Sequence, residues 1–235
     1  MIPAAKLAEQ LALITHIDIL TARDIVRAWQ RLSPETRLST ALIPDLMSLV
    51  TEIATAYGEV TAVAAADFYD YMAELAGTRL PPAVPVSPVP PRAQVESMVR
   101  WATGPLRLPD GPLPDAALKR LTGAAQRLAQ QPGRRTLMGA CARDGVRFAR
   151  VPQGSETCPY CLMLASRGAV YWTQGTAMAA YHDSCDCAVI AVHQDDDLPE
   201  FNQRLHSEWH EATRGRPDQI AAWREYVAAT YQTPN

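Results

Sequence analysis

The 235-residue sequence lacks several features that would assign it quickly to a class of protein. No apolar run approaches the roughly twenty residues of a membrane-spanning helix. The opening residues, Met-Ile-Pro-Ala-Ala-Lys, do not have the pattern of a secretory signal peptide. Neither a Gly-x-Ser-x-Gly elbow nor a His-Glu-x-x-His pair occurs. We therefore expect no membrane association and a chain that is made and kept in a reducing cytoplasm.

Cysteine is also scarce, but four of the five cysteines lie in one short stretch. A Cys-x-x-Cys pair at Cys158 and Cys161 precedes a His-x-x-Cys-x-Cys element formed by His182, Cys185 and Cys187. These five side chains are candidate ligands for a tetrahedral metal site that needs four. The pattern predicts a structural Zn²⁺ site, with Cys158, Cys161, His182 and Cys185 as first-choice ligands. Cys187 is the alternate ligand, because alternation along a following strand can point it to the opposite side.

Other interpretations of the cysteines stay open at this stage. Disulfides are disfavoured in a reducing compartment, and a thioredoxin-like redox pair normally lacks a second His-x-x-Cys-x-Cys element. A metal-free structural knuckle remains an alternative to zinc. Catalytic zinc is disfavoured, because it keeps an open coordination position and a nearby general base. Cys141 lies outside the motif and is expected to be a buried thiol.

The N-terminal third is predicted to be a long helical hairpin. Apolar residues follow helical spacing over 4–32, and Ser33-Pro34-Glu35 has the form of a second helix start. The second helix is expected to run to about Gly77, with a kink or interruption at Pro44. Six prolines then fall within 79–92, which indicates an extended spacer. The predicted organisation is a helical arm (1–78), a Pro-rich linker (79–92) and an α+β domain (93–235).

The remaining sequence predicts a compact domain that contains helices and a small sheet. Expected helices cover about 92–102, 114–130, 133–146, 195–214 and 217–231, with Gln131-Pro132-Gly133 separating the second from the third. Expected strands cover 146–151, 169–172 and 188–192, so the cysteines would stand at strand ends and staple a three-stranded sheet against the helices. The predicted fold class is α+β, predominantly α, with a Cys/His knuckle.

Charge is distributed unevenly along the chain. Residues 116–150 hold eight lysines and arginines and a single acid, Asp144, although the net charge of the chain is −3. A basic middle between acidic ends indicates a phosphate-facing surface or internal and subunit charge pairing. His206 and His210 stand four apart on an expected helix, but their order is not that of a zinc-protease motif.

The cysteine stretch resembles the signature of MuF-type minor head proteins of tailed phages. It resembles more closely the head-morphogenesis proteins that actinobacteriophages encode beside the portal gene. The positions that carry this resemblance are Cys158, Cys161, Arg167, Gly168, Val170, Tyr171, His182, Cys185 and Cys187. The resemblance implies a protein of the virion or procapsid, made in the bacterial host cytoplasm. It also implies partners among portal, scaffold and major capsid proteins.

Two other functions remain as alternatives. Similar proteins are often labelled capsid maturation proteases, and Ser155, Ser166 and Ser184 lie near His182 and His193 in the sequence. No nucleophile motif surrounds these serines, so a structural role is favoured over a serine protease. A zinc-knuckle nucleic-acid-binding protein is the second alternative, with the 116–150 segment facing viral DNA. A homo-oligomer is possible through the long helices.

Overall fold

The computed structural model describes residues 3–32, 40–77, 84–107, 114–153, 157–172, 183, 185, 187–194 and 197–231. Seven α-helices, two short 3₁₀ turns and two strands are found in these residues. The helices are α1 (Ala4–Leu32), α2 (Ile43–Leu75), α3 (Arg92–Thr103), α4 (Pro114–Asp144), α5 (Pro159–Ser166), α6 (Glu200–Thr213) and α7 (Gln219–Thr230), with η1 (Thr40–Leu42) and η2 (Gly104–Arg107). The strands are β1 (Arg147–Val151) and β2 (Ala188–Val192). The predicted α+β class, predominantly α, is confirmed.

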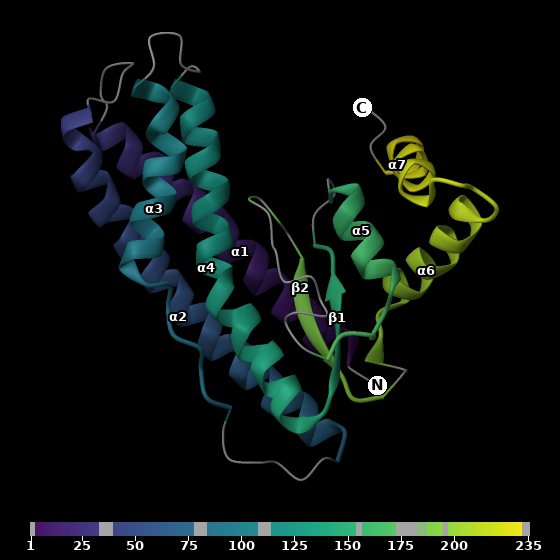
Figure 1. The fold of residues 1–235 in the computed structure, drawn as a ribbon. Helices are drawn as coiled ribbons and strands as arrows, with labels where there is room; N and C mark the ends of the chain where they lie inside the picture. Colours follow the sequence, from purple (N-terminus) through teal and green to yellow (C-terminus); the bar gives the residue numbers. More distant parts are fainter. Residues whose placement is uncertain are drawn as a thin grey trace.

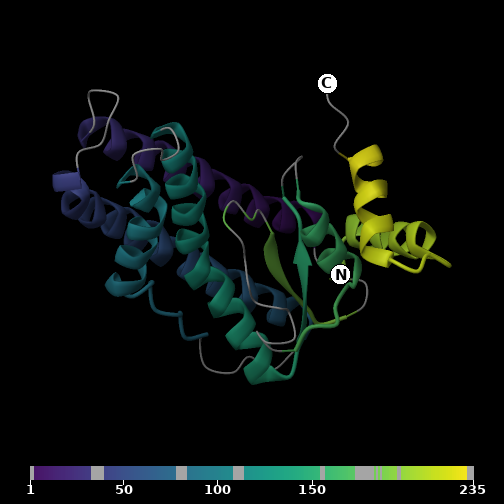
Figure 2. The ribbon, with the colours of Figure 1, turned by 45° about the horizontal axis from the view of Figure 1, so that its top comes forward.

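The elements form three groups along the molecule (Figure 1). Helices α1 to α4 gather on one side, the two strands lie in the middle, and α5 to α7 lie on the other side. The same order is seen in the turned view of Figure 2, where α6 and α7 project away from the long helices. None of the described helices combines the length and apolarity needed to cross a bilayer.

The long helices contribute to two successive hydrophobic cores. At one end, α1, α2, α3 and α4 bury a four-helix core that includes Trp29, Leu46, Val99 and Leu121. At the other end, the later turns of α2 and α4 cover the sheet and bury Phe68, Tyr69, Phe148 and Ile190, among others. Leu7 and Leu11 of α1 also pack against this second core, so α1, α2 and α4 all contribute to both cores. The division into an arm, a linker and a second domain stays a prediction, and residues 78–83 lie outside the described ranges.

The sheet consists of β1 and β2 in antiparallel register, from Arg147 opposite Val192 to Val151 opposite Ala188. All five residues of β2 are buried, which fits its unbroken apolar sequence Ala-Val-Ile-Ala-Val. The predicted strand at 169–172 is wrong. Tyr171 makes an isolated bridge to Phe148, with a 2.9 Å bond from the Phe148 amide to the Tyr171 carbonyl. Trp172 beside it is 50% exposed, so this segment touches the sheet edge at one residue only.

The predicted helix start at Ser33-Pro34-Glu35 lies outside the described residues, and the two predicted interruptions have different outcomes. Pro44 stands in the first turn of α2, where a missing amide costs no hydrogen bond, so the α-helix is interrupted before this proline and is not kinked at it. The predicted break at Pro132 is wrong. Pro132 lies inside α4, which continues through the expected break. Thr61 of α2 donates a 2.8 Å hydrogen bond to the Ala129 carbonyl, one turn before this proline. The missing amide of Pro132 frees the Leu128 carbonyl, and the Thr61 hydroxyl binds the carbonyl next to it.

Candidate metal centre

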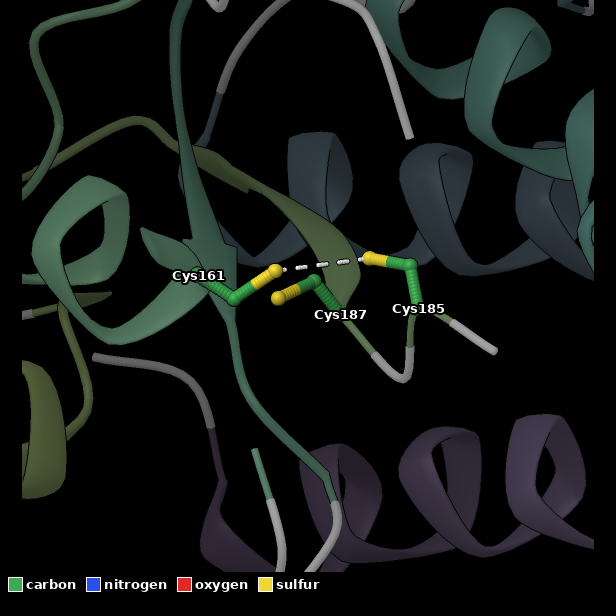
Figure 3. Close-up of side chains that lie close together, drawn as sticks. All are labelled: Cys161, Cys185 and Cys187. Carbon is green, nitrogen blue, oxygen red and sulfur yellow. Dashed lines mark hydrogen bonds between the residues drawn. The ribbon is translucent and has the colours of Figure 1, made fainter. Parts of the chain in front are cut away.

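Three cysteine side chains converge at the junction between α5 and β2 (Figure 3). Cys161 belongs to the first turns of α5, and Cys187 directly precedes β2. The Sγ atoms of Cys161, Cys185 and Cys187 lie within 4.8 Å of one another. The Cys161 and Cys185 sulfurs are 3.6 Å apart, and all three residues are at most 4% exposed. The cluster thus joins two segments that are separated in the sequence.

Cys158 stands beside this group at the start of α5. It is the N-cap of the helix, and its Sγ accepts a 3.3 Å hydrogen bond from the Cys161 amide. Pro159 occupies the first helical position, where its fixed φ suits a helix start. The Cys-x-x-Cys spacing therefore places the first sulfur at the amino end of a helix and the second in its first turn. This short helix was not predicted from the sequence, which indicated only a Cys/His knuckle.

Two buried arginines contact the cysteine segment. Arg150 of β1 is 1% exposed, and its Nη2 lies 3.5 Å from the Cys185 sulfur and 3.9 Å from the Cys161 sulfur. Arg134 of α4 is 6% exposed and donates to the Cys185 carbonyl at 2.7 Å and to the Cys187 carbonyl at 3.1 Å. Charged side chains are rarely buried unless they are paired. Their positions indicate that negative charge on the sulfurs is favoured here.

The four sulfurs influence one another's ionisation. Hydrogen bonds with the side chains of Cys158, Cys185 and Cys187 raise the pKa of the Cys161 thiol far above its ordinary value. Hydrogen bonds from Cys161 and Cys187 lower the pKa of Cys185, and the charge of Arg134 lowers it further. The two shifts are opposite in direction because the sulfurs share hydrogen bonds. Thiols gathered in this way are soft ligands for a metal ion, which displaces their protons when it binds.

The structure gathers part of the predicted ligand set. Cys161, Cys185 and Cys187 come together, with Cys158 packed against them. The expectation that Cys187 points to the opposite side is wrong, because the residue precedes β2 and its sulfur faces Cys161. His182 lies outside the described residues. Cys141 is fully buried in the helix–sheet core, away from the cluster, and burial raises the pKa of its thiol.

Sequence reasoning missed the arginines of the site. Arg150 stands two positions after Phe148 in β1, a strand whose last four residues are buried. Arg134 follows Gly133 on a buried turn of α4. A basic residue at a position where the period predicts burial is the signal that would have identified both. Without the fold, that signal cannot be distinguished from a solvated basic helix face.

The described serine and histidine residues do not form a hydrolytic group. Ser166 is buried and donates to the Met163 carbonyl at 2.7 Å, while His206 contacts the Ser166 carbonyl at 3.0 Å through Nδ1. The His193 ring lies tilted against Tyr69, with ring centroids 5.7 Å apart. The rings of His206 and His210 meet edge to face at 4.5 Å. Ser155 and Ser184 lie outside the described residues.

The basic segment is used partly inside the molecule. Arg127 pairs with Asp183 at 2.8 Å, and Arg143 pairs with Asp144 at 2.6 Å. Arg134 and Arg150 contact the cysteine segment, as described above. Lys119 and Arg120 are exposed on α4, and the Arg120 guanidinium lies 5.8 Å from the ring centre of Trp101. Internal pairing therefore accounts for several of the charges in 116–150.

Together these features define a helix-rich α+β protein with a buried cysteine cluster that can bind a metal. The family model of the VG15 protein matches residues 1–212, and the chain belongs to this family. The Gene 15 protein of Mycobacterium phage D29 is 30% identical, over 37% of this chain and 44% of that protein. The Gene 15 protein of Mycobacterium phage L5 is 29% identical, over 46% of this chain and 52% of that protein.

The chain spans about half the length of the curated relatives it matches. No solved structure matches it. The comparisons therefore show that the chain belongs to a family of phage proteins. Its fold is known from the present structure alone.

Proposed function

We propose that the protein is a MuF-like minor head protein that acts in procapsid assembly, in association with portal or scaffold protein. The observation that carries this proposal is the family match over residues 1–212, whose relatives come from mycobacteriophages. The signature around the cysteines, which resembles that of phage head-morphogenesis proteins, supports the same role. Its place of action would then be the procapsid or the virion interior.

The long helices offer a surface that suits assembly with other proteins. Val60 and Val63 stand three apart on α2 and are 47% and 52% exposed, and Ile19 of α1 is 59% exposed. Residues three apart on a helix lie on one face. Exposed apolar pairs of this kind favour protein–protein contact over solvent. In this proposal, α2 contacts a head component while the cysteine centre holds the opposite part of the molecule together.

Co-assembly tests the proposal directly. The chain is produced together with the portal, scaffold and major capsid proteins of its phage, and particles are separated by sedimentation. We expect the chain to sediment with procapsids, and the double variant Val60→Asp/Val63→Asp to be depleted from them. Ile220→Asp on α7 is the matched control, because Ile220 is also an exposed apolar side chain, at 43%. A chain that never sediments with procapsids or portal overturns the proposal. Scaffold or capsid fragments in the same fractions would instead indicate the maturation protease.

The exposed end of the basic segment favours a second role, contact with viral DNA. Trp101 is 53% exposed beside Arg120, and Lys119 precedes Arg120 on the same exposed turn of α4. A cation and an aromatic face together suit phosphates and unstacked bases. Filter binding of single-stranded DNA across a salt series tests this role. We expect affinity to fall steeply with salt, and Lys119→Gln/Arg120→Gln to reduce the slope by about one to two units. A salt-independent signal would exclude it.

A further inference from the structure

We propose that Cys158, Cys161, Cys185 and Cys187 bind one Zn²⁺ ion as an all-cysteine tetrahedral site, whose charge is balanced by Arg134 and Arg150. This assignment goes beyond the assembly role and does not depend on it. It also replaces the first-choice ligand set derived from the sequence, because it includes Cys187 and leaves out His182.

The spacing of the sulfurs supports a single bound ion. Tetrahedral zinc with Zn–S bonds of about 2.3 Å places its sulfurs about 3.8 Å apart. The Cys161 and Cys185 sulfurs are 3.6 Å apart, and Cys187 completes a group whose members are all within 4.8 Å. The side chains enter this group from α5 and from the segment before β2 (Figure 3). Three corners of a tetrahedron are therefore present in the fold.

Cys158 is the side chain best placed for the fourth corner. Its Sγ accepts a 3.3 Å hydrogen bond from the Cys161 amide, so it already lies next to one corner. Its place at the N-cap of α5 exposes it to the positive end of the helix dipole, which stabilises a thiolate. Cys158 is half-buried and packs against the other three cysteines.

The buried charges distinguish four cysteines from three cysteines and a histidine. Zn²⁺ with four thiolates has a formal charge of −2, whereas three thiolates and a neutral imidazole give −1. Two buried guanidinium groups contact this segment, one at the sulfurs and one at the carbonyls of Cys185 and Cys187. Buried charge is tolerated when it is paired, so two cations match the all-cysteine site. The soft thiolate set also favours zinc over calcium or magnesium.

Metal content and the spectrum of bound Co²⁺ test the assignment on the full chain. Protein produced with added zinc is expected to contain one zinc per chain by mass spectrometry of the folded state. When Co²⁺ replaces zinc, each thiolate ligand contributes to a near-ultraviolet sulfur-to-cobalt band. We expect Cys158→Ser to lose about a quarter of that band's intensity, as one of four thiolates in a tetrahedral site. His182→Ala and Cys141→Ser are the matched controls and should leave the band unchanged.

Each outcome decides the proposal. A band that is unchanged in Cys158→Ser but altered in His182→Ala overturns the all-cysteine set in favour of three cysteines and a histidine. A wild-type chain that neither retains zinc nor develops a Co²⁺ band overturns the site altogether. If Cys158→Ser fails to fold, His182→Ala still discriminates, because the proposal requires its Co²⁺ spectrum and its zinc stoichiometry to equal those of the wild type.

Discussion

Arg150 is a buried cation in contact with the sulfur cluster. Its effect on metal binding and its effect on folding can therefore be measured separately. Without metal, its removal eliminates a costly buried charge; with metal, its removal leaves bound thiolates less well compensated. We expect Arg150→Met to weaken zinc affinity by about 10- to 100-fold while the unfolding midpoint in chelator stays equal or rises. Competition with a chromophoric chelator and thermal unfolding in chelator measure the two quantities.

Two variants serve as references for this prediction. Arg147→Met lies three positions earlier on β1, where it leaves the contact with the sulfurs intact, and should keep wild-type affinity. Arg150→Lys retains a positive charge and should recover part of the affinity. Equal loss of affinity and of metal-free stability in Arg150→Met would mean that the residue acts through packing alone.

His193 gives the molecule a predictable pH dependence near neutrality. Burial against Tyr69 lowers the pKa of the imidazole, although Asp197 and Asp144 oppose the shift. In the unfolded chain histidine titrates near pH 6.5. Below that pH the unfolded state therefore binds a proton more readily than the folded state, and stability falls as the pH falls. The contribution is fully present above the unfolded pKa.

We expect His193→Phe, which keeps an aromatic ring beside Tyr69 but cannot titrate, to flatten the pH dependence of the free energy of unfolding between about pH 5 and pH 7. Urea unfolding at several pH values measures it. His16→Gln removes an exposed histidine from α1 and should keep the wild-type slope. If the free energy of unfolding has the same pH dependence in His193→Phe and in the wild type, the pKa of His193 does not change on folding.

At the scale of elements, the crossing of α2 and α4 depends on glycine. A Cβ atom added at Gly133 would meet the Thr61 carbonyl oxygen at 2.7 Å, a backbone atom that cannot rotate away. We expect Gly133→Ala to destabilise the fold by about 1–3 kcal/mol, as overpacked core variants do. Gly139→Ala on the same helix meets nothing within 4 Å and should be neutral or stabilising by up to about 1 kcal/mol. Denaturant unfolding of both variants measures the difference. If the two variants behave alike, close helix approach is not what Gly133 provides.

The same crossing shows where sequence reasoning reached its limit. Helical period located α1, α3 and most of α2, and an apolar run located β2, because those signals are local. Pro132 was interpreted as a break because its neighbours, Gly58 and Thr61 of α2, are about 70 positions earlier in the sequence. The 169–172 segment has strand-like composition, but its one β-bridge in the described structure is to Phe148. Cys spacing identified the site, whereas its arginines depend on a strand and a helix brought together by folding.

At the scale of the whole molecule, the cysteine centre lies between the helix–sheet core and a separate hydrophobic cluster in the C-terminal helices. Helices α5, α6 and α7 share their own cluster around Leu162, Leu205 and Trp223. Their connections to the rest include Asn202, whose side-chain amide donates to the Arg150 carbonyl at 2.8 Å and to the Ala165 carbonyl at 3.0 Å. The cluster of Cys161, Cys185 and Cys187 is a second connection, because it joins α5 to the start of β2. The stability of this junction should therefore depend on metal more than the stability of the long helices does.

Hydrogen exchange with and without chelator tests that dependence. After metal removal we expect faster exchange of amides in α5 and at the start of β2, because the cross-link no longer opposes local opening there. Amides of α2 and α4 in the four-helix core should keep their protection, since that core contains no residue of the cysteine segment. Cys158→Ser without chelator should show the same change to a smaller extent, because the other three thiolates remain. Uniform loss of protection through α2 and α4 would instead mean that the metal supports the entire fold, and unchanged exchange in α5 would mean that no metal-dependent link exists.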